Sequence, residues 1–188
     1  MRIKIFSTTL EISFLTVAVT TVVLMLDTSY RFLCCIVCAF LHEFGHLVAM
    51  IILKVEVSNI NIRLFDIVIE SKTDRTFKSD LVITLMGPMF NFLFAIIFYF
   101  VDVSLCYTNL AFAIFNLLPV DTFDGGYILY LLLYQKCSYE TVRIISKLLT
   151  FIFLLPIFMF GVMVLFYSRY NYSLLLISLY LVAILFLK

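Results

Sequence analysis

The sequence predicts an all-α polytopic membrane protein with six transmembrane helices, the fourth of them broken, and a small β-hairpin between helices 2 and 3. Composition predicts the class: 64% of the residues are hydrophobic and 13% are charged, with a mean hydropathy of +1.16. In soluble domains, about a quarter of all residues are charged. The number of helices follows from the apolar runs, since about 20 helical residues cross the hydrocarbon core of a bilayer.

Six apolar runs suit membrane spans, and together they predict a single membrane domain over residues 1–188. The runs cover residues 8–26, 32–53, 80–101, 104–134, 146–167 and 172–187. The second to fourth runs, about 32–134, are expected to form the core, with the other three flanking it. A cytoplasmic N-terminus places all 13 Lys and Arg residues except Arg31 and Arg169 on the cytoplasmic side, as the positive-inside rule requires. Both termini are therefore expected in the cytoplasm.

The first run, 8–26, follows a short basic segment that resembles the start of a signal peptide, with Arg2 and Lys4. No small-residue cleavage site of the Ala-x-Ala kind follows it. We therefore expect this run to remain as a membrane helix. No long basic run occurs elsewhere, so no nucleic-acid partner is expected.

The second run holds the only two histidines of the chain, in the block His42-Glu43-Phe44-Gly45-His46. Residues four apart on a helix share one face at about 6 Å, so His42 and His46 can offer their imidazoles to one metal ion. Glu43 lies beside them as a candidate base. Ionisable residues within spans are costly and usually functional, which favours a metal-hydrolase site over polar residues that merely pair with backbone.

The polar segment between the second and third runs shows the alternation typical of strands. Apolar residues recur with a period of two in 55–62 and again in 67–69, which predicts a hairpin. The alternative is a cytoplasmic loop whose alternation is incidental. An unpaired strand edge within 55–69 could take up an extended peptide by β-addition.

The third run carries Gly87-Pro88 and then Asn91. Proline removes a helical hydrogen bond and kinks a helix. The amide of Asn91 needs partners that lipid cannot supply, so it is predicted to face other helices. Two interpretations remain open for Asn91: structural contact between helices, or a position beside the reaction centre.

The fourth run is interrupted between Pro119 and Gly126. Non-helical backbone at membrane depth must pack in protein or line a watery cavity. The second and fourth spans run in the same direction, which brings this break to the depth of the histidines and makes Asp124 or Asp121 the third metal ligand. Asp124 is preferred because two glycines follow it and let backbone approach closely. Two histidines and a carboxylate are a standard zinc set that leaves one position for water.

These segments resemble the motifs of the site-2 protease family of intramembrane zinc metalloproteases. The resemblance rests on the block from His42 to His46, on the segment from Gly87 to Asn91, and on Asn116-Leu117-Leu118-Pro119 followed by Phe123-Asp124-Gly125-Gly126. The predicted layout of six spans with cytoplasmic ends is similar to the bacterial sporulation proteases that release a pro-sigma factor. One departure is Thr122-Phe123, where the family often has proline and leucine, so the substrate-facing loop is expected to differ in shape.

The resemblance implies one Zn²⁺ ion and a set of site residues. The implied metal ligands are His42, His46 and Asp124, Glu43 is the catalytic residue that activates water, and Asn116 and Asn91 contact the substrate backbone or the oxyanion. The expected activity is hydrolysis of a peptide bond near the cytoplasmic face, in regulated intramembrane proteolysis. The expected partners are a membrane-embedded or membrane-associated pro-protein substrate, the lipid bilayer and a regulatory membrane protein. The expected location is a bacterial cell membrane.

Two other functions are compatible with the same residues. In a divalent-metal or proton transporter, His42, His46 and Asp124 would line a path for the ion and no general base would be needed. In a non-catalytic scaffold, the histidine block would be vestigial, although its ligand and base types are intact. Substitution of Glu43 by Gln separates the protease from the transporter, because only the protease depends on a base.

Overall fold

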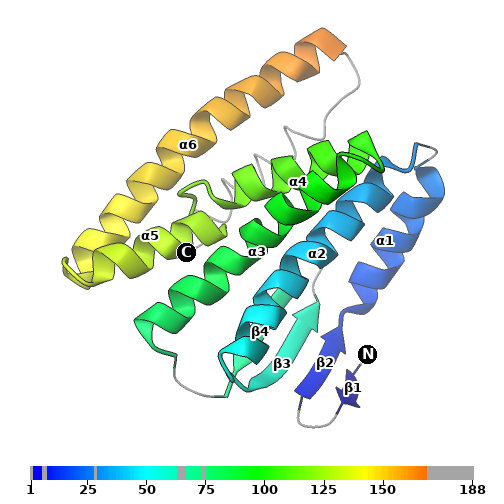
Figure 1. The fold of residues 1–188 in the computed structure, drawn as a ribbon. Helices are drawn as coiled ribbons and strands as arrows, with labels where there is room; N and C mark the ends of the chain where they lie inside the picture. The colour runs from blue at the N-terminus through cyan, green and yellow to red at the C-terminus, as the bar shows by residue number, and fades with distance from the viewer. Residues whose placement is uncertain (1, 6–7, 28, 63–66, 73–74, 169–188) are drawn as a thin grey trace. The chain divides into compact units, whose positions relative to one another are not determined.

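The structure is a computed structural model that describes residues 2–5, 8–27, 29–62, 67–72 and 75–168 (Figure 1). Its elements in chain order are β1 (Arg2–Ile5), β2 (Thr8–Ile12), α1 (Phe14–Leu26), α2 (Arg31–Ile52), β3 (Val57–Ile62), β4 (Ile67–Ser71), α3 (Phe77–Phe98), α4 (Val103–Asn116), α5 (Asp124–Tyr134) and α6 (Tyr139–Ser168). The sixth predicted span, 172–187, lies outside the described residues. The chain divides into two compact units, Met1–Ala113 and Ile114–Lys188, and each is described by itself.

The helices confirm the predicted class of polytopic membrane protein. Among the described residues, three helices are long and apolar enough to cross a membrane: Arg31–Ile52, Phe77–Phe98 and Tyr139–Val164. The first two have 22 residues each, which at 1.5 Å per residue matches a hydrocarbon core of about 30 Å. Two shorter apolar helices, α1 and α4, accompany them.

A four-stranded sheet with the order β1-β2-β3-β4 belongs to the first unit. The predicted hairpin is confirmed as the antiparallel pair of β3 and β4. The sheet is larger than predicted because residues 8–12, expected to begin the first span, form β2 and pair in parallel with β3. Leu10 lies opposite Ile60 and Glu11 opposite Asn61, so apolar and polar side chains alternate between the two faces. Helix α1 consequently begins at Phe14.

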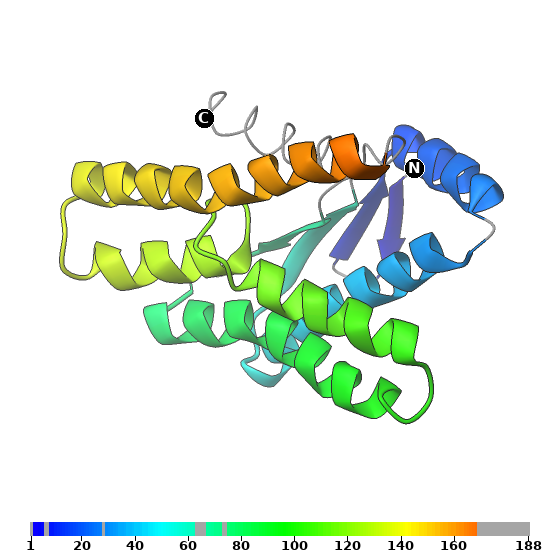
Figure 2. The ribbon, with the colours of Figure 1, turned by 90° about the horizontal axis from the view of Figure 1, so that it is seen from above.

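The sheet packs against α2 and α3 through a small apolar core (Figures 1 and 2). Ala49, Met50 and Ile83 are buried there, and Val57 and Ile69 of the sheet contact them. This core fixes the C-terminal end of α2, the helix that carries the histidine block, against its neighbours.

Gly45 sets the distance between α2 and α3. A Cβ atom at this position would lie 2.5 Å from the carbonyl oxygen of Met86 and 2.9 Å from the side chain of Phe90. Such contacts are too short for any side chain, so glycine alone allows this approach of the two helices. The histidines on either side of Gly45 are thereby brought close to α3.

The second unit contains the predicted break between α4 and α5, followed by α6. Residues 117–123 leave the helical conformation, and Val120 is fully buried with Leu154 of α6. The Asp121 amide donates a hydrogen bond to Thr150 Oγ1 at 3.0 Å. Figure 2 shows α5 and α6 side by side. The break is therefore an ordered loop packed on a helix, as non-helical backbone in a membrane requires.

Candidate metal centre

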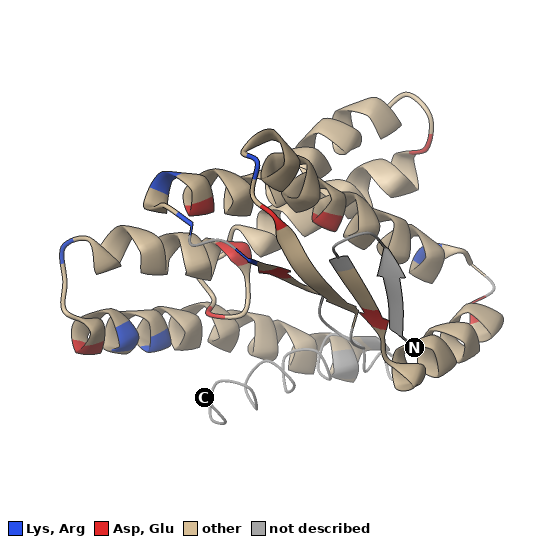
Figure 3. Ribbon diagram, turned by 90° about the horizontal axis from the view of Figure 1, so that it is seen from below, with Lys and Arg blue, Asp and Glu red and all other residues tan. Residues whose placement is uncertain are grey.

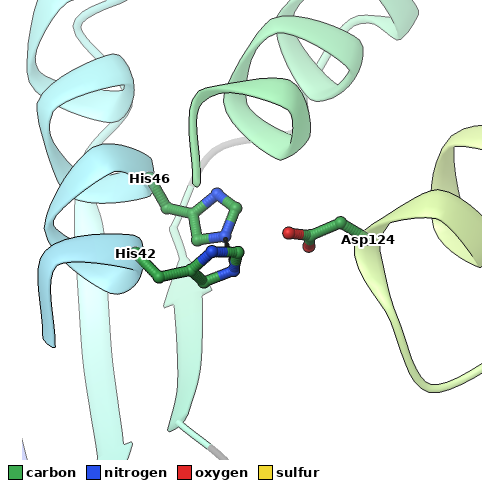
Figure 4. Close-up of side chains that lie close together, drawn as sticks. All are labelled: His42, His46 and Asp124. Atoms are coloured by element: carbon green, nitrogen blue, oxygen red, sulfur yellow. Dashed lines mark hydrogen bonds between the residues drawn. The ribbon is translucent and has the colours of Figure 1, made fainter. Parts of the chain in front are cut away.

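His42 and His46 lie one turn apart on the buried face of α2, as predicted. Their exposed fractions are 6% and 9%. The two Nε2 atoms are 3.2 Å apart, with the rings nearly perpendicular at 85° (Figure 4). The helical spacing therefore brings one nitrogen of each ring to a common point.

The outer nitrogen of His46 is held by the main chain of α3. Its Nδ1 lies 2.8 Å from the carbonyl oxygen of Ile83. A carbonyl can only accept, so Nδ1 carries the proton and donates it. In the neutral ring, Nε2 is then an unprotonated ligand atom.

The outer nitrogen of His42 is held by Asn91, which is fully buried on α3. His42 Nδ1 lies 3.0 Å from Asn91 Oδ1. The amide orientation is set from its other end, where Asn91 Nδ2 donates at 3.2 Å to the Cys38 carbonyl and at 3.2 Å to Asn109 Oδ1. Asn91 Oδ1 must therefore accept from His42, which leaves His42 Nε2 unprotonated as well.

This arrangement fits a cation between the two rings. Two unprotonated nitrogens that face each other at 3.2 Å repel through their lone pairs, and a cation shared by both turns the repulsion into attraction. Zinc–nitrogen bonds of about 2.0–2.1 Å at a tetrahedral angle place two nitrogens about 3.3–3.4 Å apart. Metal-bound histidines also donate their second ring N–H to a carbonyl or carboxylate. The pair thus has the spacing and outer contacts of two zinc ligands.

Gly87 of α3 leaves room for the two rings. A Cβ atom at this position would lie 2.4 Å from both Cε1 and Nε2 of His46 and 2.8 Å from Cε1 of His42. Sequence analysis singled out Gly87 only as part of a motif and as the residue before a proline. The structure gives the physical reason for glycine, since any side chain would occupy the space where the ligand atoms meet.

Glu43 follows His42 on α2 and is half-buried. It is the only Asp, Glu, Lys or Arg between Phe32 and Leu53 of this helix, whereas the charges of α3 and α6 lie near their N-terminal ends (Figure 3). A carboxylate in the middle of an apolar span costs free energy, and such residues usually have a function. The position of Glu43 beside His42 would suit a base.

The remaining candidates belong to the second unit. Asp124 is the first residue of α5 and is half-buried, at the end of a helix where a carboxylate is favoured. The two glycines after it allow α5 to pack on the preceding loop, since a Cβ atom at Gly125 or Gly126 would lie 2.2 or 2.1 Å from a loop carbonyl oxygen. Asn116 ends α4. In the first unit, the structure brings His42, His46 and Asn91 together.

Asn109 was not identified by sequence analysis. It is fully buried on α4 and accepts a hydrogen bond from Asn91. It belongs to no motif that we recognised, and the only available signal was an amide within an apolar run, the same signal that Asn91 gave.

Among solved structures, the chain is similar to the site-2 protease from Methanocaldococcus jannaschii. The two share 24% sequence identity with a TM-score of 0.68, over 96% of this chain and 91% of that protein. The chain has the fold of a site-2 protease. Neither a protein-family model nor a curated protein matches the chain. The fold expected from the three sequence motifs is thus confirmed by an independent comparison.

Proposed function

We propose that this chain is an intramembrane zinc metalloprotease that hydrolyses a peptide bond of a membrane-embedded or membrane-associated protein near the cytoplasmic face. The observation that carries the proposal is the histidine pair, whose Nε2 atoms face each other at 3.2 Å while both Nδ1 atoms donate to fixed acceptors. The likeness of the fold to a site-2 protease supports it. A site for hydrolysis within a membrane explains why ionisable residues are kept there.

For the metal ligands we propose His42, His46 and Asp124. Each of the three offers one donor atom to a metal ion, an imidazole nitrogen or a carboxylate oxygen. Two imidazoles and a carboxylate are a common zinc set in hydrolases. Bound zinc would supply Lewis acidity at the scissile carbonyl and a water that ionises near neutral pH.

Glu43 is proposed as the catalytic base. Its carboxylate would take the proton from the attacking water and return it to the leaving amine, which avoids charging the amine in the membrane interior. The charges of one Zn²⁺, Asp124 and ionised Glu43 sum to zero, so the set is compatible with a low dielectric. Each acidic residue alone would cost about 2.5–3.5 kcal/mol at a helix centre.

Asn116 and Asn91 are proposed for different tasks. Asn116, which ends α4 before the break, is a candidate donor to the substrate backbone or to the developing oxyanion. The contact between Asn91 and the Nδ1 of His42 at 3.0 Å favours a role in orienting a metal ligand over the substrate contact that the family resemblance implies.

The sheet is a candidate for presenting the substrate. Peptide bonds inside a helix are shielded by their own hydrogen bonds, so a membrane helix must unwind before hydrolysis. Strand β4 ends the order of the sheet and pairs with β3, which leaves an edge for an extended segment.

Glu43→Gln tests the proposal, because it removes the base while preserving size and polarity. Purified protein in vesicles would be mixed with single-span membrane proteins, and cleavage and bound zinc would both be measured. We expect the variant to keep its zinc and to lose at least about 100-fold in cleavage, the lower end of general-base contributions. Unchanged cleavage, or zinc transport that survives the substitution in the absence of wild-type cleavage, would contradict the proposal and favour a transporter.

A further inference from the structure

A chain of buried amides connects α4 to the metal-ligating face of α2. It runs from the Leu105 carbonyl through Asn109 and Asn91 to His42, and we call Asn109 and Asn91 the amide relay. Asn109 Nδ2 donates to the Leu105 carbonyl at 2.9 Å, and Asn91 Nδ2 donates to Asn109 Oδ1 at 3.2 Å. Both amides have an exposed fraction of 0%. No water is needed to complete these contacts.

Each step of the relay permits a single direction of donation. The Leu105 carbonyl can only accept, so it fixes the Nδ2 end of Asn109 towards itself and the Oδ1 end towards Asn91. That oxygen in turn selects the Nδ2 end of Asn91, which leaves Asn91 Oδ1 facing His42 Nδ1 at 3.0 Å. The proton of the neutral imidazole is thereby kept on Nδ1, away from the shared space of the two rings.

Reversal of Asn91 would block the metal centre. If its amide turned by 180°, Nδ2 would face His42, and the imidazole would have to accept at Nδ1 and carry its proton on Nε2. That nitrogen would then be no metal ligand. The Cys38 carbonyl also favours the observed orientation, because it accepts from Asn91 Nδ2 at 3.2 Å. Asn109 supplies the second of these two acceptors.

We propose that Asn109 is a positioning residue of the metal centre, which acts through Asn91 to hold His42 in the tautomer that presents Nε2. The inference rests on the proposed function only in requiring that the histidine pair binds a metal. A purely structural alternative, in which the amides only join α3 to α4, makes a different prediction. It expects lost stability without a specific effect on the metal.

Zinc affinity and the visible spectrum of the cobalt-substituted protein test the relay. Both would be measured on the full chain in detergent, with zinc affinity obtained by competition with a chelator. Asn109→Leu removes the acceptor, and we expect about tenfold weaker zinc binding, the lower end of the range for outer-shell partners, with a changed cobalt spectrum. Asn109→Ala removes the same acceptor without added bulk and serves if the leucine variant fails to fold.

Two further variants separate positioning from helix packing. Asn109→Asp keeps an acceptor oxygen towards Asn91 and should bind zinc nearly as tightly as wild type. Thr108→Val is the matched control on α4, because the Thr108 hydroxyl donates to the Ser104 carbonyl and lies outside the relay. It should leave zinc affinity and the cobalt spectrum unchanged.

A double-mutant cycle completes the test. If Asn109 acts through Asn91, the double variant Asn91→Leu/Asn109→Leu should bind zinc no more weakly than Asn91→Leu alone. Independent, additive losses would overturn the relay, as would wild-type affinity in both Asn109→Leu and Asn109→Ala. A wild-type chain that binds no zinc would contradict the proposed function itself.

Discussion

The two histidines reach a common point because each outer nitrogen, Nδ1, is held by an acceptor, and the two acceptors are of different kinds. His46 donates to a main-chain carbonyl, that of Ile83, and His42 donates to the side chain of Asn91. A substitution can therefore remove the second contact but not the first. Gly87 provides the third condition, an open space in front of both rings.

Substitution of Gly87 by Ala should strongly weaken metal binding. The added methyl group would lie 2.4 Å from Nε2 of His46, so the ring must move out of the ligand position. We expect zinc affinity to fall about 100-fold or more, beyond most outer-shell losses, as measured by chelator competition. Ile83→Val is the control on the same helix. It trims a buried side chain and costs about 0.5–1.5 kcal/mol of stability, but keeps the carbonyl that accepts from His46. Equal zinc binding by Gly87→Ala and wild type would refute the steric argument.

At the scale of elements, the start of α2 depends on one carboxylate. Asp27 accepts hydrogen bonds from the amide and hydroxyl of Ser29, at 3.0 and 2.8 Å, and from the amide of Phe32 at 2.7 Å. The bond from the Ser29 hydroxyl, helped by the Phe32 amide, holds the pKa of Asp27 below its usual value. Its stabilising contribution is therefore present above the unfolded pKa of about 3.9 and is lost as the pH falls through the folded value.

Hydrogen exchange at the first turn of α2 should show this dependence. In the wild-type chain, protection of the Phe32 amide should be full at pH 5 and should decline as the pH falls below about 4. Asp27→Asn should show weaker protection that no longer changes over this range. Asp102→Asn, which alters the corresponding contact with the Leu105 amide of α4, should leave the behaviour of α2 intact. If the protection of the Phe32 amide in Asp27→Asn still declined with falling pH as in wild type, another group would be the cause.

The loop before α5 depends on its contact with α6. Thr150 is buried, and its hydroxyl accepts from the Asp121 amide at 3.0 Å. This bond and the burial of Val120 hold the loop that leads to Asp124. Loop and helix thus determine where α5 begins.

Thr150→Val should destabilise this loop. The change preserves shape but leaves the Asp121 amide without its acceptor, which costs about 1–3 kcal/mol for a buried donor. Thermal unfolding should report the loss. Ser146→Ala is a matched control one turn earlier on α6, because the buried Ser146 hydroxyl has no hydrogen-bond partner among the described residues. It should cost little, and a loss equal to that of Thr150→Val would reject the role of the hydrogen bond.

At the scale of the whole molecule, sequence analysis succeeded where the signal was local. The histidine block, the broken fourth run and the polar segment between the second and third runs each carry their pattern within a few residues. The pairing of β2 with β3 was missed because it joins Leu10 to Ile60, and the residues of β2 run directly into an apolar stretch. The role of Asn109 was missed for the same reason, since its partner Asn91 lies on another helix.

The fold is shared with a site-2 protease at 24% identity over nearly the whole chain. At this identity most side chains differ between the two proteins, so the comparison shows a shared fold and no particular side-chain contact. The proposed protease role therefore depends on the site residues and on whether they bind zinc.

X-ray absorption at the zinc edge of the purified chain tests whether His42 and His46 bind zinc. Histidine ligands give a characteristic imidazole signal, with zinc–nitrogen distances of about 2.0–2.1 Å. We predict one zinc per chain with two imidazoles and a carboxylate oxygen, and loss of the bound zinc in both His42→Ala and His46→Ala. A chain that retains no zinc after loading, or a zinc spectrum that is the same in wild type and in the two histidine variants, would contradict it.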